Sequence, residues 1–249
     1  MKITTGRCVT ALLAGALLLG AGLAPTAAMA AETTSTTAVV SSDEQRQFDE
    51  LTAHLTEFLS EYGVAPDTQQ ALVVKLRSGT VLDSMTEASP VSTDTSASDA
   101  ATKTIETFQD GSIRVTSVEK PKPAPDPGTI STRGGGFGEC SQSGDENHQW
   151  NKNCSIERWD GIITQHFYAN FTYVTPGYDY IDSVWGATYQ VWGASSASQT
   201  YFGITKQYED AAGPAVAEQR VAAQVPVLGS MSYYLALRVG YGGATVEGS

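Results

Sequence analysis

The sequence has few cysteines and few basic residues, and each shortage excludes a class of protein. Only 3 of its 249 residues are Cys, too few for a disulfide-dense scaffold. Lys and Arg number 15 against 27 Asp and Glu, a net charge of −12. Because nucleic acids and anionic membranes attract clustered positive charge, we expect neither as a partner. The acidic balance favours solubility, or a cationic partner such as a basic peptide or a divalent metal.

Long apolar runs are missing too, apart from one near the N-terminus. The run from Val9 to Leu23 is uncharged, follows the basic residues Lys2 and Arg7, and is too short to span a hydrocarbon core of roughly 30 Å. Ala28-Met29-Ala30 has the small-x-small pattern of a signal-peptidase site. Residues 1–30 are therefore predicted to be a secretory signal peptide. We expect an extracellular protein with no integral membrane segment after its removal.

Two cysteines outside this leader enclose a polar loop. In an exported chain, Cys140 and Cys154 are predicted to form one intramolecular disulfide, and closing such a loop contributes roughly 3 kcal/mol. Between them, Asp145, Glu146 and His148 offer one imidazole and two carboxylates. A zinc site usually needs three or four nitrogen or sulfur ligands, and the spacing differs from that of an EF-hand. We predict a stapled surface loop with no metal site and no cofactor, cation binding being the alternative.

Two helices are predicted near the start of the mature chain. In the first, apolar residues recur at steps of three and four: Phe48, Leu51, Leu55, Phe58 and Tyr62. Ser41 and Glu44 form a capping box before it. The second has Pro66 in its first turn and ends near Arg77. Segment 31–85 is therefore predicted to be a helical hairpin.

Linkers and a hairpin separate the helices from the rest of the chain. Residues 86–102 are rich in Ser, Thr, Ala and Asp and lack large apolar side chains, which predicts a disordered linker. In 103–120, Asp110-Gly111 lies between two β-rich runs and predicts a β-hairpin. Residues 121–136 contain repeated Pro and then a Gly triplet, which predicts a stiff spacer followed by a flexible joint.

From residue 137 to residue 249 the pattern is that of β-structure. Apolar and polar residues alternate in IITQHFYANFTYV, as in a half-buried strand. In the next run, Ile181, Trp185 and Val191 fall on one face, which places Trp185 in the core. AVAEQRVAAQV fits either a strand or a helix. Short strands separated by turn residues predict an antiparallel β-sandwich, so the whole chain is predicted to be α+β.

Several motifs resemble those of one group of proteins. These are EYGV, QQALVVKLRSG, LDSM and FQDGSIRVTSVEKP, then CSIERWDGIITQHFYANFTYV followed by YDYIDSVWG. They are similar to uncharacterised secreted proteins from actinobacteria that pair a short helical segment with a Cys-containing β domain. The resemblance implies secretion and a β-sandwich. It implies no activity, substrate or catalytic residue.

No catalytic constellation stands out. His166 can be combined on paper with Ser183 and with Asp179 or Asp182, but the sequence has no Gly-x-Ser-x-Gly elbow. Carboxylates that could act in pairs on a glycosidic bond have no spacing that fixes their separation: Glu157, Asp160, Asp179, Asp182, Glu209 and Asp210. We therefore predict no catalytic residue, and a secreted hydrolase is the least favoured function.

Aromatic side chains are the most informative feature of the β domain. Trp150, Trp159, Trp192 and Tyr178 fall in loops, beside turns or on the less apolar strand faces. Such rings can stack on sugars or anchor protein contacts, or they can instead cover neighbouring strands or dock the helices. We predict a secreted non-catalytic binding module for an extracellular glycan or protein, of unknown oligomeric state, with these four residues in contact with the ligand. The alternative is a secreted toxin or effector that acts on a target cell.

Overall fold

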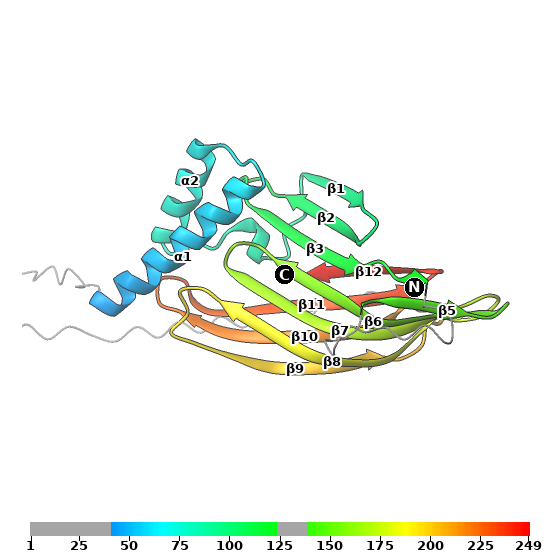
Figure 1. Ribbon diagram of the computed structural model, residues 1–249. Helices are drawn as coiled ribbons and strands as arrows, with labels where there is room; N and C mark the ends of the chain where they lie inside the picture. Colours follow the sequence, from blue (N-terminus) through cyan, green and yellow to red (C-terminus); the bar gives the residue numbers. More distant parts are fainter. Residues whose placement is uncertain (1–40, 124–138) are drawn as a thin grey trace, which may run out of the picture. The chain divides into compact units, whose positions relative to one another are not determined.

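The computed structural model describes residues 41–123 and 139–249. The predicted signal peptide and most of the predicted 121–136 linker lie outside these ranges. The described chain contains two α-helices and is otherwise mostly antiparallel β-sheet (Figure 1). It is therefore an α+β protein in which strands dominate. Neither of these helices combines the length and the apolarity that crossing a membrane requires.

The elements follow one another from the helices to the strands. The helical elements are α1 (Ser42–Glu61), α2 (Pro66–Arg77) and the short 3-10 helix η1 (Asp83–Met85). The first strands are β1 (Ser92–Ala97), β2 (Ala101–Thr107), β3 (Ile113–Glu119) and β4 (Lys122–Pro123). After the gap come β5 (Ser141–Gly144), β6 (His148–Trp159), β7 (Ile163–Val174) and β8 (Tyr180–Val191). The last four are β9 (Ser196–Lys206), β10 (Ala215–Val225), β11 (Gly229–Gly240) and β12 (Gly243–Gly248).

Local sequence accounts for the start of α1. The Ser41 hydroxyl accepts a hydrogen bond from the Glu44 backbone at 3.2 Å, and the Glu44 carboxylate accepts one from the Ser41 backbone at 2.9 Å. This reciprocal capping box satisfies two backbone donors that the helix itself cannot pair. Four residues of the predicted apolar stripe, Phe48, Leu51, Leu55 and Phe58, are buried on α1, as is Leu59. The fifth, Tyr62, is the C-cap residue that follows the helix.

The strands form two sheets. In the first, β1, β2, β3, β6, β7 and β8 follow one another as antiparallel neighbours, and β5 pairs with the start of β6. The two-residue strand β4 pairs with β5 in parallel. The second sheet has the order β12-β11-β10-β9 and is antiparallel throughout. Segment 215–225, which the sequence left open between strand and helix, is the strand β10 between β9 and β11.

The structure corrects the prediction of a disordered linker at 86–102. Strand β1 lies within this segment and pairs with β2 from Ser92↔Thr107 to Ala97↔Thr102. All six side chains of β1 are exposed. The strand therefore does not need apolar residues, because it buries none of its side chains. An edge strand needs backbone pairing and tolerates polar side chains. The partner of β1 is β2, which pairs on its other side with β3 in the hairpin expected around Asp110-Gly111.

One core cluster joins the helices to the ends of several strands. Leu55 and Leu59 of α1 and Leu76 of α2 are fully buried in it. Several other members of the cluster lie in or near the β6–β7, β8–β9 and β10–β11 turns: Ile162, Ile163, Val191, Val221, Ala223 and Val225. The apolar faces of α1 and α2 are therefore buried against one end of the sheets, where Figure 1 also shows the two helices.

Two glycines allow α1 to approach the turns. Gly161 has φ +84°, and a Cβ added there would lie 2.7 Å from the Phe58 ring. Gly193 has φ +71°, and a Cβ added there would lie 2.6 Å from Leu51 Cβ and 2.8 Å from the Gln47 carbonyl oxygen. Both positions combine a left-handed backbone with the absence of space for a side chain, so only glycine meets both demands.

A second core cluster lies between the two sheets. It combines Ile156, Phe167 and Phe171 of the first sheet with Leu235 and Leu237 of the second, all essentially inaccessible to solvent. Phe167, Ala169 and Phe171 of this cluster are spaced two apart along β7, and Leu235 and Leu237 two apart along β11, as expected where one face of each strand is buried. The two sheets therefore share one apolar interior.

Gly193→Ala should destabilise the protein by more than Gly229→Ala. Both glycines have a positive φ, at +71° and +81°, so alanine is strained at either site. Nothing lies within 4 Å of the Cβ position at Gly229, so that variant measures the backbone strain alone. We expect Gly193→Ala to lower the unfolding free energy by a further 1 to 3 kcal/mol or so, because α1 must shift. Equal urea midpoints for the two variants would contradict the close approach of α1.

Candidate functional site

The predicted stapled loop is a β-hairpin held at its base by a disulfide. Cys140 and Cys154 are bonded, as the sequence predicted. Between them, the Asp145 carboxylate accepts hydrogen bonds from the backbone N–H groups of Asn147 and His148, both at 2.8 Å. The Asn147 bond and the His148 ring hold the pKa of Asp145 below its usual value. Asp145 thus supports the turn, and the described residues contain no group of three His, Cys, Asp or Glu placed to hold a metal ion.

Two of the predicted ligand contacts lie against α1. The Trp159 indole N–H donates to the Tyr62 hydroxyl at 3.0 Å. The Trp192 ring stacks on His54, with ring centroids 3.5 Å apart and an interplanar angle of 22°. Trp192 therefore contacts α1, and Trp159 contacts the residue that caps the C-terminus of α1. Docking of the helices was the alternative role that the sequence left open for these aromatic residues.

Trp185 lies on the outer face of its strand, so its predicted core position is wrong. Pairing between β7 and β8 shifts register twice, and each shift reverses the inward-outward alternation of β8. Trp185 consequently pairs with Tyr168, and the two rings stack with centroids 6.0 Å apart. Gly186, at φ +66°, lies beside one of the shifts. Periodicity alone did not reveal these bulges.

The structure does not assemble the Ser-His-Asp set that can be written from the sequence. His166 pairs with Thr188, whereas Ser183 accepts a hydrogen bond from Asn170, and Asp182 accepts one from Thr172. Thr172 is six residues along β7 from His166, which corresponds to roughly 20 Å. Burial lowers the pKa of His166, although Glu157 and Glu119 oppose this.

The remaining carboxylate candidates have structural partners. Asp160 forms a fully buried ion pair with Arg158 at 2.9 Å. Its other oxygen accepts the backbone N–H groups of Ile162 and Ile163, both at 3.0 Å. Asp210 pairs with Lys206 at 2.6 Å. These groups hold the turns between strands rather than face one another across a cleft.

A cross-strand row that contains three aromatic residues and Thr172 lies at the end of the first sheet opposite to the helices. Trp150 pairs with Thr172, Thr172 pairs with Tyr180, and Tyr180 forms a bridge with Tyr208. Residues paired across antiparallel strands project from the same face of a sheet. The Tyr180 and Tyr208 rings have centroids 5.6 Å apart. Trp150 also lies parallel to the His148 ring, with centroids 5.9 Å apart.

Three exposed tyrosines lie on neighbouring turns at this end. Tyr178 is 58%, Tyr208 56% and Tyr241 80% exposed. They come from the β7–β8 turn, the segment between β9 and β10, and the β11–β12 turn. Tyrosine rings so exposed are not held by core packing, so the three can contact a partner. We call Tyr178, Tyr208 and Tyr241 the tyrosine cluster.

Two buried carboxylates bring these three turns together. Asp179, 2% exposed, accepts hydrogen bonds from the Val174 N–H at 2.8 Å and the Gly242 N–H at 2.7 Å. Glu209, 6% exposed, accepts them from the Tyr241 N–H at 3.1 Å and the Asp179 N–H at 3.1 Å. Hydrogen bonds to a charged acceptor are stronger than those between neutral groups. The two carboxylates therefore hold the backbone at all three tyrosines of the cluster.

Sequence reasoning identified only part of this site. Tyr178 was predicted as a ligand contact, but Tyr208 and Tyr241 were not, because the three residues lie far apart in the chain. One signal was present in the sequence: Tyr178-Asp179 and Tyr208-Glu209 both place a carboxylate after a tyrosine. Nothing in the sequence showed that these carboxylates are buried.

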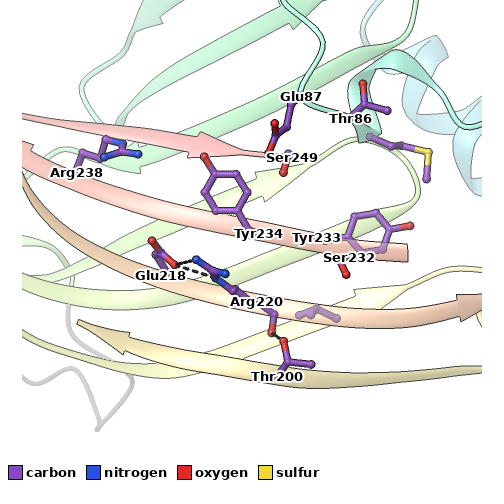
Figure 2. A pocket seen from close by; sticks show the side chains of 12 residues that line it. Thr86, Glu87, Thr200, Glu218, Arg220, Ser232, Tyr233, Tyr234, Arg238 and Ser249 are labelled. Atoms are coloured by element: carbon purple, nitrogen blue, oxygen red, sulfur yellow. Dashed lines mark hydrogen bonds and ion pairs between the residues drawn. The ribbon is translucent and has the colours of Figure 1, made fainter. Parts of the chain in front are cut away.

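A polar groove lies elsewhere, mostly over the outward-facing side chains of β10 and β11 (Figure 2). Its cavity volume is about 640 Å³, within the range of small-molecule sites. One wall is the segment that follows η1. The lining residues include Thr86, Glu87, Thr200, Glu218, Arg220, Ser232, Tyr233, Tyr234 and Arg238. Figure 2 shows Glu218 paired with Arg220, at 2.7 Å.

Comparison with known proteins returns no match. No protein-family model matches the sequence, and no curated protein and no solved structure matches the chain. The resemblance to secreted actinobacterial proteins therefore stays an expectation, and the function must be argued from the geometry.

Asp179→Asn should loosen the turns of the tyrosine cluster. The two Asp179 oxygens accept from different N–H groups, Val174 on one and Gly242 on the other. An amide has one oxygen, so one of these donors must lose its partner. We expect the unfolding free energy to fall by about 1 to 3 kcal/mol. Backbone amide exchange at Val174 or Gly242 should rise at least about tenfold.

Asp182→Asn is the matched control for this change. Asp182 is exposed and accepts a hydrogen bond from the Thr172 hydroxyl at 2.9 Å. Its substitution should change the stability by less than about 0.5 kcal/mol. Equal exchange rates at Val174 and Gly242 in the Asp179 and Asp182 variants would show that Asp179 does not hold the turns.

Proposed function

We propose that the protein is an extracellular, non-catalytic binding module whose ligand is a glycan. The observation that carries this proposal is the tyrosine cluster, in which three exposed phenol rings project from turns whose backbone is held by the buried carboxylates of Asp179 and Glu209. Aromatic rings provide contact area at a low cost in side-chain entropy. Rigid turns reduce the entropy that binding would otherwise lose.

The chemistry around the cluster favours a neutral carbohydrate. The flat face of a phenol or indole ring packs on the apolar face of a sugar ring, and the phenol hydroxyl hydrogen-bonds at its edge. Tyr180 adjoins Tyr208 of the cluster, and Trp150 lies beyond Thr172 in the same cross-strand row. The chain carries a net charge of −12, which repels polyanions such as nucleic acids and acidic polysaccharides.

Secretion and the finer architecture belong to the same proposal. Residues 1–30 act as the signal peptide, and the Cys140–Cys154 disulfide is the kind of bond that forms in an oxidising compartment. The mature chain is then a helical hairpin on an antiparallel β-sandwich. The shared interior of the two sheets and the packing of α1 and α2 against one end support this architecture.

Removing any ring of the cluster should weaken glycan binding. We expect the chain to be retained on an insoluble neutral polysaccharide, tested with cellulose, chitin and mannan, without release of soluble sugar. Tyr178→Ala, Tyr208→Ala and Tyr241→Ala should each raise the Kd about tenfold or more, a typical effect of a central binding residue. The measurement is a depletion isotherm on the polysaccharide that retains the protein.

Tyr201→Ala is the matched control, because Tyr201 is an exposed tyrosine on β9, outside the cluster. Its isotherm should equal that of the unchanged protein. Failure to bind any of the three polysaccharides, or equal binding by all four variants, would reject the glycan proposal. Retention by cell-wall protein alone would point to a protein ligand, and sugar release would point to a hydrolase.

A further inference from the structure

Strand β1 has a free edge that lacks the protection of the other sheet edges. Its six exposed residues pair with β2 without a register shift, and on the other side they pair with no described strand (Figure 1). Among the other edge strands, β8 and β9 contain register shifts and lie beside each other, β12 lies beside β3, and β4 has two residues. Bulges, short length and cover by other elements protect a sheet edge from pairing with another chain. In the part of the chain that the structure describes, β1 has none of these.

Alternate residues of β1 supply the backbone groups on its free side. At the β1–β2 turn, the Ser98 N–H donates to the Ala101 carbonyl oxygen at 2.9 Å, which identifies a hydrogen-bonded pair. Such pairs alternate with non-hydrogen-bonded pairs along an antiparallel ladder. The residues of β1 that bond to β2 are therefore Ser92, Asp94 and Ser96. The residues whose N–H and C=O groups point away from the sheet are Thr93, Thr95 and Ala97.

This edge is complementary to a second copy of itself. When two copies of β1 run antiparallel with Thr95 opposite Thr95, Thr93 lies opposite Ala97 and Asp94 lies opposite Ser96. All three outward residues then form hydrogen-bonded pairs, in each of which the two residues exchange both of their N–H···O bonds. Asp94 and Ser96 form a non-hydrogen-bonded pair, in which side chains lie closest, so the serine hydroxyl can donate to the carboxylate.

Charge and strand length select this register over its neighbours. Pairing centred on Asp94 would place two carboxylates directly opposite each other, and like charges in that position are destabilising. Pairing centred on Thr93 would place Ala97 opposite Ser89, which lies outside the strand. Pairing centred on Thr95 avoids both faults. It also brings no two charged side chains of β1 together, in a chain whose net charge is −12.

We propose that β1 is a self-association edge, through which two copies of the chain join their first sheets by antiparallel β1–β1 pairing centred on Thr95. The two-fold relation makes each contact occur twice. Because the interface is small and polar, the dimer is reversible, with a Kd on the order of 100 µM. The proposal does not rest on the role proposed for the tyrosine cluster, because the two surfaces share no residue.

Sedimentation equilibrium of the purified full chain, from about 1 µM to about 1 mM, measures this association. We expect a reversible equilibrium between monomer and dimer. Thr95→Lys and Thr95→Glu should each raise the Kd about fivefold or more, because like charges then face each other across the two-fold axis. An equimolar mixture of the two variants should form dimers again, because residue 95 then faces the opposite charge.

Ser198→Lys is the matched control, because Ser198 is an exposed residue on the edge strand β9. Its Kd should equal that of the unchanged protein. Thr95 is exposed, so the melting temperatures of its charge variants should stay close to that of the unchanged protein. This comparison separates a lost interface from a lost fold.

Cysteine cross-linking measures the register. Residue 95 faces its own copy in a hydrogen-bonded pair, with Cα atoms roughly 5.5 Å apart, a separation that a disulfide spans. Thr95→Cys should therefore form a covalent dimer under mild oxidation. Thr93→Cys, an equally exposed position, faces Ala97 and should cross-link much more slowly.

Three results of the sedimentation experiment would each overturn the proposal: a monomer at every concentration, a dimer that both charges at position 95 leave intact, or a mixture that forms no dimer. Equal cross-linking rates in Thr93→Cys and Thr95→Cys would overturn it as well. A dimer that Tyr208→Ala removes and the Thr95 variants keep would place the interface at the tyrosine cluster instead.

Discussion

The packing of α1 against the turns at one end of the sheets is the constraint on which the rest of the structure depends. Two helices of this size cannot bury their apolar faces against each other alone, because stability in short helices comes from tertiary packing. Leu55 and Phe58 therefore pack with side chains at the strand ends. Gly161 and Gly193 permit this, since any side chain at either turn would meet α1. Trp159 and Trp192, which the sequence pattern offered as ligand contacts, are used to dock the helix.

The opposite end of the strands is held by a different interaction. No described helix contributes to the network there, and its turns are joined by backbone N–H groups that donate to Asp179 and Glu209. Burying a carboxylate is costly unless hydrogen bonds replace its water. Each of these two receives two such bonds from backbone groups. Because carboxylates rather than apolar side chains hold these turns, the tyrosines beside them remain free to face solvent, which makes this end suited to binding.

The fold was predictable where local rules decide it. Ser41 and Glu44 specify the start of α1 through side-chain bonds to nearby backbone, and Asp110-Gly111 specifies a turn through the conformational freedom of glycine. The pairing of Cys140 with Cys154 followed from there being no other candidate outside the leader. The strand β1 was missed because composition measures the burial of side chains, whereas β1 is held by backbone pairing with β2.

The candidate site was predictable only in part. Trp150 and Tyr178 were singled out by type and position, but the contribution of Tyr208 and Tyr241 required knowing which turns meet. The sequence by itself determined the α+β composition, the capped first helix, the disulfide and the acidic charge, because each depends on residues close together in the chain or on simple totals. Tertiary structure alone decided which face Trp185 occupies and which tyrosines gather, because register shifts and long-range backbone hydrogen bonds join segments that no local pattern connects.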